Sequence, residues 1–167
     1  DTSFLVTYLV SRFARDTVTV ILSGVGGDEL FGGNRRYLWP EIGRYLNWIP
    51  LWLQTGVIRP VLNRLPVDRG SRIKALLRYL RGYYAHVDQP DGLRYQGYVQ
   101  IFDDEQLDSV FSPALNRQLD GYKPSQVADY YDQAPGKDPL SKMLYADLKT
   151  ALVDSLLAFS DKMSMAV

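Results

Sequence analysis

Residues 18–33 read Val-Thr-Val-Ile-Leu-Ser-Gly-Val-Gly-Gly-Asp-Glu-Leu-Phe-Gly-Gly, and this stretch decides the fold expected for the chain. Val18–Leu22 is a compact run rich in β-branched residues, which is typical of an interior strand. The glycine-rich turn behind it leads into Asp-Glu-Leu-Phe, a short helical segment that the pair Gly32-Gly33 is expected to end. The sequence therefore predicts a mostly α chain with a single short interior strand.

Helical patterns lie on both sides of this stretch. Apolar residues at steps of three and four predict an amphipathic helix from Phe4 to about Arg15. Prolines at positions 40, 50 and 60 are expected to cut the segment 37–64 into short helical pieces. A further amphipathic helix is predicted by an apolar stripe of Ile73, Leu76, Leu77 and Leu80.

The last long helix has a recognisable start. Asp138 is predicted to cap it and Pro139 to occupy its first position. Leucines at every fourth position from Leu140 to Leu156 form one face, and the helix is expected to end near Ala158. No repeat or long linker divides the sequence, so we expect one helical body.

Length and composition exclude several classes of protein. The 167 residues suit one domain, and 46% hydrophobic residues suffice for a packed core. Nineteen basic residues balance nineteen acidic ones, which argues against a broad nucleic-acid surface. The sequence has no cysteine, and residues 1–5 lack the basic and long apolar regions typical of a signal peptide. No apolar run approaches the roughly 20 residues that a bilayer requires. We therefore expect a cytoplasmic protein with no nucleic-acid and no membrane partner.

The turn after the predicted strand is the candidate for chemistry. A strand, a glycine turn and a helix start together present backbone N–H groups to an anion. Asp28, at the start of the helix, could share that space with a phosphate only through a divalent cation, so it is a candidate Mg²⁺ ligand. Alternatively, the glycines only make a tight connection, while Asp28 and Glu29 complement the helix dipole. Dinucleotide, Walker and nucleophile-elbow motifs do not fit these residues.

Two stretches resemble one enzyme family. Leu22–Gly33 followed by Arg36-Tyr37 resembles the SGxGxDExFGGY segment of the glutamine-dependent asparagine synthetases. The second match comprises Asp147-Leu148-Lys149, Leu156-Leu157 and the run from Asp161 to Ala166, which is similar to the family's DLKxxLPxxLLxKxDRMSMA motif. About a hundred residues between them carry no motif that we can match.

The resemblance implies a partial synthetase domain over residues 1–167, a fragment of an α/β adenine-nucleotide α-hydrolase-like fold. Residues 1–37 would form its strand-turn-helix nucleotide segment, and residues 38–167 its helical part. Such enzymes use ATP and Mg²⁺ to turn a carboxylate into an acyl-adenylate, which ammonia from glutamine then amidates. By resemblance, Ser23 and Gly24 would contact the nucleotide, Asp28 would bind Mg²⁺, and Glu29 would cap the helix or support the metal ligand. No catalytic residue is assigned.

Departures from the family pattern leave other readings open. Val25 stands where the family often has a glutamate thought to assist the ammonia step, and Asn34 stands where tyrosine is usual. No SGGxDS pyrophosphate loop, glutaminase domain or catalytic lysine after the SMA motif occurs in these residues. We therefore expect an internal fragment, inactive alone, whose partners are the glutaminase domain, the remaining synthetase segments and a small carboxylate substrate. A noncatalytic scaffold, or an enzyme with another acceptor, such as a β-lactam-like synthetase, stays open.

The remaining distinctive residues have ordinary interpretations. His86 has no ligand partner at metal spacing and is expected to be a packed or surface histidine. Trp39, Trp48 and Trp52 suit core packing or a buried domain interface. A solvated helix face is the preferred interpretation of the basic stripe Arg69, Arg72, Lys74, Arg78 and Arg81. A fragment that lacks its neighbouring strands would also expose apolar surface that favours homo-oligomers.

Overall fold

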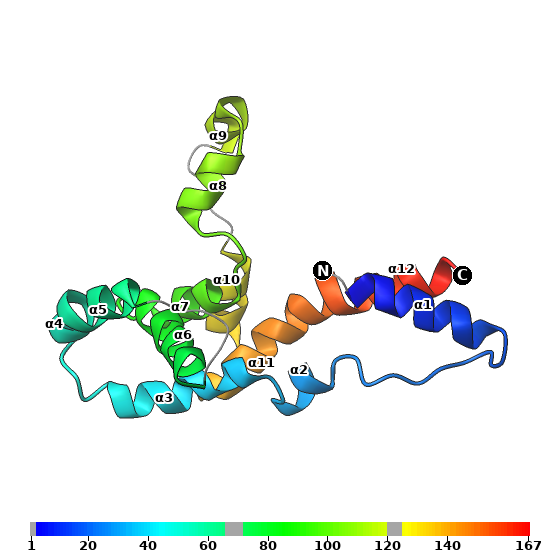
Figure 1. The fold of residues 1–167 in the computed structure, drawn as a ribbon, viewed down its shortest axis with the longest axis horizontal. Helices are drawn as coiled ribbons and strands as arrows, with labels where there is room; N and C mark the ends of the chain where they lie inside the picture. The colour runs from blue at the N-terminus through cyan, green and yellow to red at the C-terminus, as the bar shows by residue number, and fades with distance from the viewer. Residues whose placement is uncertain (1–2, 66–71, 120–124) are drawn as a thin grey trace. The chain divides into compact units, whose positions relative to one another are not determined.

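A computed structural model describes residues 3–65, 72–119 and 125–167, which form helices joined by turns (Figure 1). The chain divides into two compact units, so the expectation of one helical body is wrong. Unit 1 combines Asp1–Tyr37 with Ala134–Val167, and unit 2 is Leu38–Gln133. The two ends of the chain thus belong to one unit, and the stretch without a family motif forms most of the other.

Unit 1 is built from two pairs of helices. The helix α1 lies beside α12, and the short helix α2 lies beside α11. Figure 1 shows the extended chain that connects α1 to α2. The helices of this unit are α1 (Ser3–Arg15), α2 (Gly27–Phe31), the 3-10 turn η1 (Arg35–Leu38), α11 (Pro139–Lys149), the π-helical η3 (Ala151–Leu157) and α12 (Ala158–Met165).

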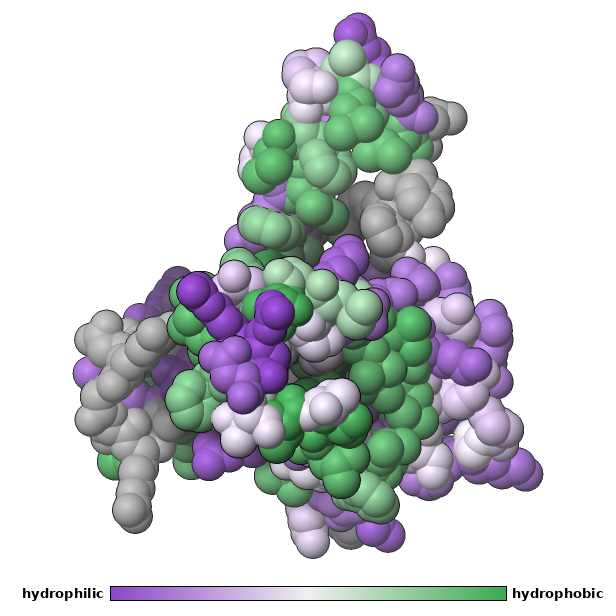
Figure 2. All heavy atoms as spheres, turned by 90° about the vertical axis from the view of Figure 1, so that its right-hand side faces the viewer, coloured by the Kyte–Doolittle hydropathy of each residue, from purple (hydrophilic) through white to green (hydrophobic). Residues whose placement is uncertain are grey.

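The predicted strand at Val18–Leu22 is wrong as a strand of this chain. The segment is extended, but within the described residues no strand pairs with it. Val20 is 76% exposed and Leu22 is 94% exposed. A strand is defined by hydrogen bonds to a neighbouring strand, and composition reveals only the local tendency. Figure 2 shows hydrophobic residues in patches among hydrophilic ones on one face.

The glycine predictions around α2 are confirmed. Gly32 caps the helix with φ 71°, and its N–H donates to the carbonyl oxygen of Asp28. Gly26 precedes the helix with φ 89°. Positive φ values strain any residue with a Cβ atom, so both positions require glycine. The chain can therefore turn sharply into and out of a helix of five residues.

The start of the last long helix is confirmed, but its end is not. The Asp138 carboxylate accepts a hydrogen bond of 3.0 Å from the Ser141 N–H, and Pro139 opens α11. Instead of ending near Ala158, the helical chain continues through η3 and α12 to Met165. Thr150, with φ −122° and ψ −81°, interrupts it. Leucine periodicity finds the helix but not this local change of winding.

The described residues of unit 2 form helices joined by turns and short loops. The helix α5 lies beside α6, and α7 lies beside α10. Its helices are α3 (Trp39–Leu46), α4 (Leu51–Leu53), the π-helical η2 (Gln54–Ile58), α5 (Arg59–Arg64), α6 (Arg72–Ala85), α7 (Asp91–Val99), α8 (Asp104–Val110), α9 (Pro113–Leu119) and α10 (Gln126–Gln133).

Two of the three prolines mark helix starts. Pro40 lies in the first turn of α3 and Pro50 directly precedes α4, where the first N–H groups of a helix have no intrahelical partner. Pro60 lies inside a continuous helical run, just after the π-helical η2. The prediction of separate short pieces is wrong for 51–64, because α4, η2 and α5 follow one another without a break.

Aromatic rings form the core of unit 2. Trp39 contacts Tyr79, Tyr83 and Tyr98 at ring-centroid distances of 5.9, 6.0 and 5.3 Å. Trp39 is buried, which confirms core packing for this residue. Trp48 and Trp52 are 91% and 70% exposed, so core packing is wrong for them, and a buried domain interface stays a prediction.

The predicted stripe on α6 is only partly covered. Ile73 and Leu76 are mainly exposed, while Tyr83 and Tyr84 at the end of the helix are buried. Helical periodicity identifies an apolar face but does not say which part of it a neighbour covers. Of the basic stripe, Arg78 and Arg81 are exposed as expected, whereas Arg69 lies outside the described residues. None of the helices that the structure describes has the length and apolar character needed to cross a membrane.

Replacing Gly26 tests how the turn into α2 is built. A Cβ atom at Gly26 would lie 2.9 Å from Leu152 Cδ1, and the backbone there has positive φ. We expect Gly26→Ala to lower the free energy of unfolding by about 1–3 kcal/mol. Gly27→Ala is the matched control, because its Cβ would meet no atom within 4 Å. Equal denaturant midpoints for the two variants would contradict this account.

The sequence predicts that His86 is either packed or on the surface, and the structure shows that it is packed. Its ring lies edge-on to Tyr98 at a centroid distance of 6.1 Å. A Cβ atom at Gly97 would lie 2.6 Å from the ring. Burial lowers the pKa of His86 below 6.5, and the positive charge of Arg59 lowers it further. The folded protein thus favours the neutral imidazole.

The lowered pKa predicts a loss of stability in mild acid. Between pH 6.5 and the folded-state pKa, the unfolded chain binds more protons at His86 than the folded chain does. The contribution of His86 to the free energy of unfolding is therefore present above pH 6.5, and it is lost as the pH falls through the lowered pKa. Denaturant unfolding of the protein and of His86→Gln, above and below pH 6.5, measures it. The loss should be smaller in the variant, and equal losses would refute the assignment.

Candidate functional site

The bend at residues 23–29 connects the extended segment to α2. Its chain reverses at Gly26, and the N–H of Gly27 donates to the carbonyl oxygen of Gly24 at 3.1 Å. The N–H of Val25 reaches Ser23 Oγ at 3.4 Å. In the part of the chain that the structure describes, the amides of Gly24, Gly26, Asp28 and Glu29 donate no hydrogen bond. The bend thus holds the free backbone donors that an anion site needs.

Asp28 is exposed and projects from α2 beside Gly33. A Cβ atom at Gly33 would lie 2.3 Å from Asp28 Oδ1, so glycine at that position leaves room for the carboxylate. Among the described residues, no three histidine or acidic side chains gather where they could hold a metal ion. Mg²⁺ in phosphate sites often takes only one or two carboxylates, with water and phosphate oxygens as its other ligands. A single exposed carboxylate therefore fits an ion held mainly by a bound nucleotide.

Glu29 has the opposite environment. It is 5% exposed, and its Oε1 lies 3.8 Å from Arg36 Nη2. The same guanidinium nitrogen lies 2.8 Å from Asp147 Oδ2 on α11. Glu29 therefore faces the interior of unit 1.

Tyr37 completes this buried group. Its hydroxyl donates a hydrogen bond to Asp147 Oδ2, and the carboxylate is 1% exposed. Burial and the bond to Asp147 raise the pKa of Tyr37, so the hydroxyl stays protonated and keeps its role as donor. We call Glu29, Arg36, Tyr37 and Asp147 the carboxylate–arginine network.

Sequence reasoning missed the carboxylate–arginine network. The sequence identifies Arg36, Tyr37 and Asp147 only as residues of the family motifs, and Glu29 only as a helix cap or a support for the metal ligand. A signal was present, because Asp147 follows the buried Met143 by four residues and so lies on the covered face of α11. An acid on that face needs a buried cation or donor. The identity of the residue that donates to Asp147 depends on the fold, because Tyr37 and Asp147 are 110 positions apart in the sequence.

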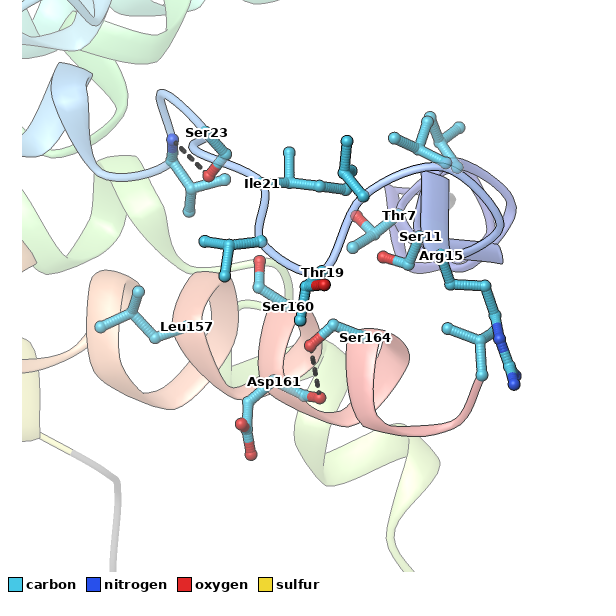
Figure 3. Close-up of a pocket in the computed structure, with 16 residues that line it drawn as sticks. Thr7, Ser11, Arg15, Thr19, Ile21, Ser23, Leu157, Ser160, Asp161 and Ser164 are labelled. Carbon is cyan, nitrogen blue, oxygen red and sulfur yellow. Dashed lines mark hydrogen bonds between the residues drawn. The ribbon is translucent and has the colours of Figure 1, made fainter. Parts of the chain in front are cut away.

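A cavity of about 820 Å³ adjoins the bend within unit 1. Figure 3 shows it between α1, the extended segment and α12. Thr7, Ser11, Thr19 and Ser160 line it with hydroxyl groups, and Ser23 links it to the bend. Asp161, a member of the second motif, also lines it, and the Ser164 hydroxyl donates to the Asp161 carbonyl oxygen. Both family motifs therefore border one space.

The carboxylate–arginine network makes a testable contribution to stability. Asp147→Ala removes the close partner of both Arg36 and Tyr37, leaving a partly buried cation short of its counter-charge. We expect the free energy of unfolding to fall by about 3–5 kcal/mol. Glu41→Ala is the control, since Glu41 pairs with Arg44 on the surface at 3.9 Å, and it should cost less than about 1 kcal/mol. Chemical denaturation measures both, and similar losses would show that the network adds nothing.

Comparison with known proteins supplies the family. The profile of the asparagine synthase family matches residues 1–167. The chain is 31% identical to "Asparagine synthetase (glutamine-hydrolyzing) 1" of Bacillus subtilis over 170 residues. It is 32% identical over 171 residues to proteins of Mycobacterium tuberculosis and Mycobacterium bovis that are provisionally named glutamine-hydrolyzing asparagine synthetases.

These alignments cover 99% of this chain and 24% of each relative, so the chain spans about a quarter of their length. No solved structure matches it significantly. The match runs through both motifs, which the carboxylate–arginine network joins. The chain belongs to the asparagine synthase family.

Proposed function

We propose that this chain is part of a longer ATP-dependent amidotransferase of the asparagine synthetase kind. In that reaction a carboxylate oxygen attacks the α-phosphate of ATP, and pyrophosphate leaves. Ammonia released from glutamine then attacks the acyl carbon of the adenylate, and AMP leaves. One observation carries the proposal: the bend at residues 23–29 has free amides beside the exposed carboxylate of Asp28. The family profile matches residues 1–167 of this chain.

The residues of the bend would bind and orient the nucleotide. The main chain of Ser23 and Gly24 would donate to phosphate oxygens, because the Gly24 amide has no competing partner among the described residues. Asp28 would hold Mg²⁺, which when bound neutralises charge on the phosphates. Glu29 would keep α2 in place through Arg36. We assign no proton transfer to these residues.

The other parts of the reaction would come from outside this chain. The glutaminase domain, the pyrophosphate loop and the catalytic lysine are the segments that the family resemblance implies. The exposed apolar residues of the extended segment would pair with further strands of an α/β adenine-nucleotide α-hydrolase-like sheet. A cytoplasmic location and a small carboxylate substrate belong to this proposal, and the 167 residues alone should not turn over.

Val25 supports a second candidate, in which the protein is a scaffold or amidates another acceptor. The side chain lines the cavity beside Ser23, where an aliphatic group cannot transfer a proton. Calorimetric titration of the intact protein with MgATP separates these possibilities. Binding supports an enzyme, whose acceptor is then sought by exchange assays with different carboxylates. No binding supports the scaffold.

Asp28→Ala tests the proposed function directly. In the intact protein we expect it to abolish ATP/pyrophosphate exchange, because the phosphates lose their metal-holding carboxylate. The unfolding midpoint should stay unchanged, since Asp28 is exposed. Glu105→Ala, an exposed acid on α8, is the control and should retain exchange. If Asp28→Ala retains exchange as well, Asp28 only complements the helix dipole.

A further inference from the structure

The glycine pair that follows α2 holds Asp28 through its backbone and leaves room for its side chain. The carbonyl oxygen of Asp28 accepts hydrogen bonds from the N–H groups of Gly32 and Gly33, the second at 3.1 Å. A Cβ atom at Gly33 would overlap Asp28 Oδ1 and lie 3.2 Å from its Cγ atom. No other residue type could therefore stand at position 33 while the carboxylate keeps this orientation.

The backbone of Gly33 does not itself require glycine. Gly32 has φ 71°, which favours glycine, whereas the φ of Gly33 does not lie in the left-handed region. A residue with a Cβ atom can adopt the conformation of Gly33 without strain. The three atoms nearest to that Cβ position all belong to Asp28. The missing side chain at Gly33 thus makes space for Asp28 and for no other nearby group.

The helix α2 is held at both ends, so it cannot turn to make room for a larger residue at position 33. Glu29 is buried, and its Oε1 lies 3.8 Å from Arg36 Nη2. At the start of α2, a Cβ atom at Gly26 would lie 2.9 Å from Leu152 Cδ1. Rotation of α2 would separate Glu29 from its cation, which is costly for a buried acid. The exposed Asp28 side chain would move instead, since it can rotate about its own bonds.

We propose that Gly33 is a positioning residue that orients the Asp28 carboxylate towards the metal ion of a bound nucleotide. The inference deepens the proposed function and rests on it, because it takes Asp28 as the Mg²⁺ ligand. Mg²⁺ requires a nearly ideal octahedral arrangement of oxygen ligands, so a carboxylate that is turned away binds it poorly. Residues that orient a metal ligand typically change metal affinity by about 10–100-fold when they are replaced.

Metal binding by Gly33→Ala in the intact protein tests the proposal. Mn²⁺ replaces Mg²⁺ as a paramagnetic probe, and it is titrated by electron paramagnetic resonance in the presence of α,β-methylene-ATP, which cannot release pyrophosphate. We expect Gly33→Ala to raise the dissociation constant of Mn²⁺ about tenfold. Gly56→Ala is the control, because its Cβ would meet no atom within 4 Å, and it should leave the constant unchanged. An unchanged constant in Gly33→Ala overturns the proposal.

A double-mutant cycle separates positioning from damage to the fold. Asp28→Ala should weaken Mn²⁺ binding at least as much as Gly33→Ala does. Adding Gly33→Ala to Asp28→Ala should cause no further loss, because no carboxylate is left to displace. A further loss overturns the proposal. If Asp28→Ala binds Mn²⁺ like the wild type, the assignment of Asp28 as metal ligand fails and the inference fails with it, whereas a loss in Asp28→Ala alone overturns only the inference.

Stability and Mg²⁺ dependence supply the last measurements. The thermal unfolding midpoint of Gly33→Ala should not fall, because the displaced group is the exposed end of one side chain. ATP/pyrophosphate exchange by this variant should require about tenfold more Mg²⁺ for half its maximal rate and should recover in excess Mg²⁺. Exchange by Asp28→Ala should not recover. A lower midpoint without a change in the Mg²⁺ requirement would make Gly33 a structural residue only and overturn the proposal.

Discussion

The ion pair between Arg36 and Asp147 holds the candidate site together. A guanidinium with two carboxylates around it loses hydration when it is buried, and such a group is stable only when its hydrogen bonds are made. Arg36 Nη2 meets Asp147 Oδ2 at 2.8 Å, and the Tyr37 hydroxyl binds the same oxygen. This fixes the chain just after α2 onto α11, across 110 positions of sequence. The shape of the glycine bend depends on that attachment, because α2 has only five residues to stabilise itself.

Local signals in the sequence predicted the local parts of this architecture. Gly32 and Asp138 end and begin helices through bonds to residues within a few positions, so their roles can be read from composition alone. Val18–Leu22 shows the limit. Its β-branched residues favour an extended chain, which the structure has, but a strand also requires a neighbour that no local pattern identifies.

Contacts distant in sequence account for the remaining differences. The stripe of α6 predicted a helix correctly, yet Ile73 is exposed while Tyr83 is buried against Trp39. Burial of the tryptophans likewise depends on the tertiary fold. Hydrophobicity favours burial of all three, and contacts between helices decide which one is covered. The motif residues of the candidate site could be named from sequence. The pairing of Glu29 and Asp147 through Arg36 could not, because it depends on how α2 lies on α11.

The two adjacent acids of the bend differ because of this pairing. Successive residues on an α-helix point about 100° apart, so both carboxylates cannot face the same surroundings. Arg36 draws Glu29 into the interior, which leaves Asp28 outside, beside Gly33 and in solvent. An acid that is already paired with an arginine is a poor metal ligand, whereas an exposed one without an ion pair remains available. The carboxylate–arginine network therefore leaves the Asp28 carboxylate, and not that of Glu29, available for a cation.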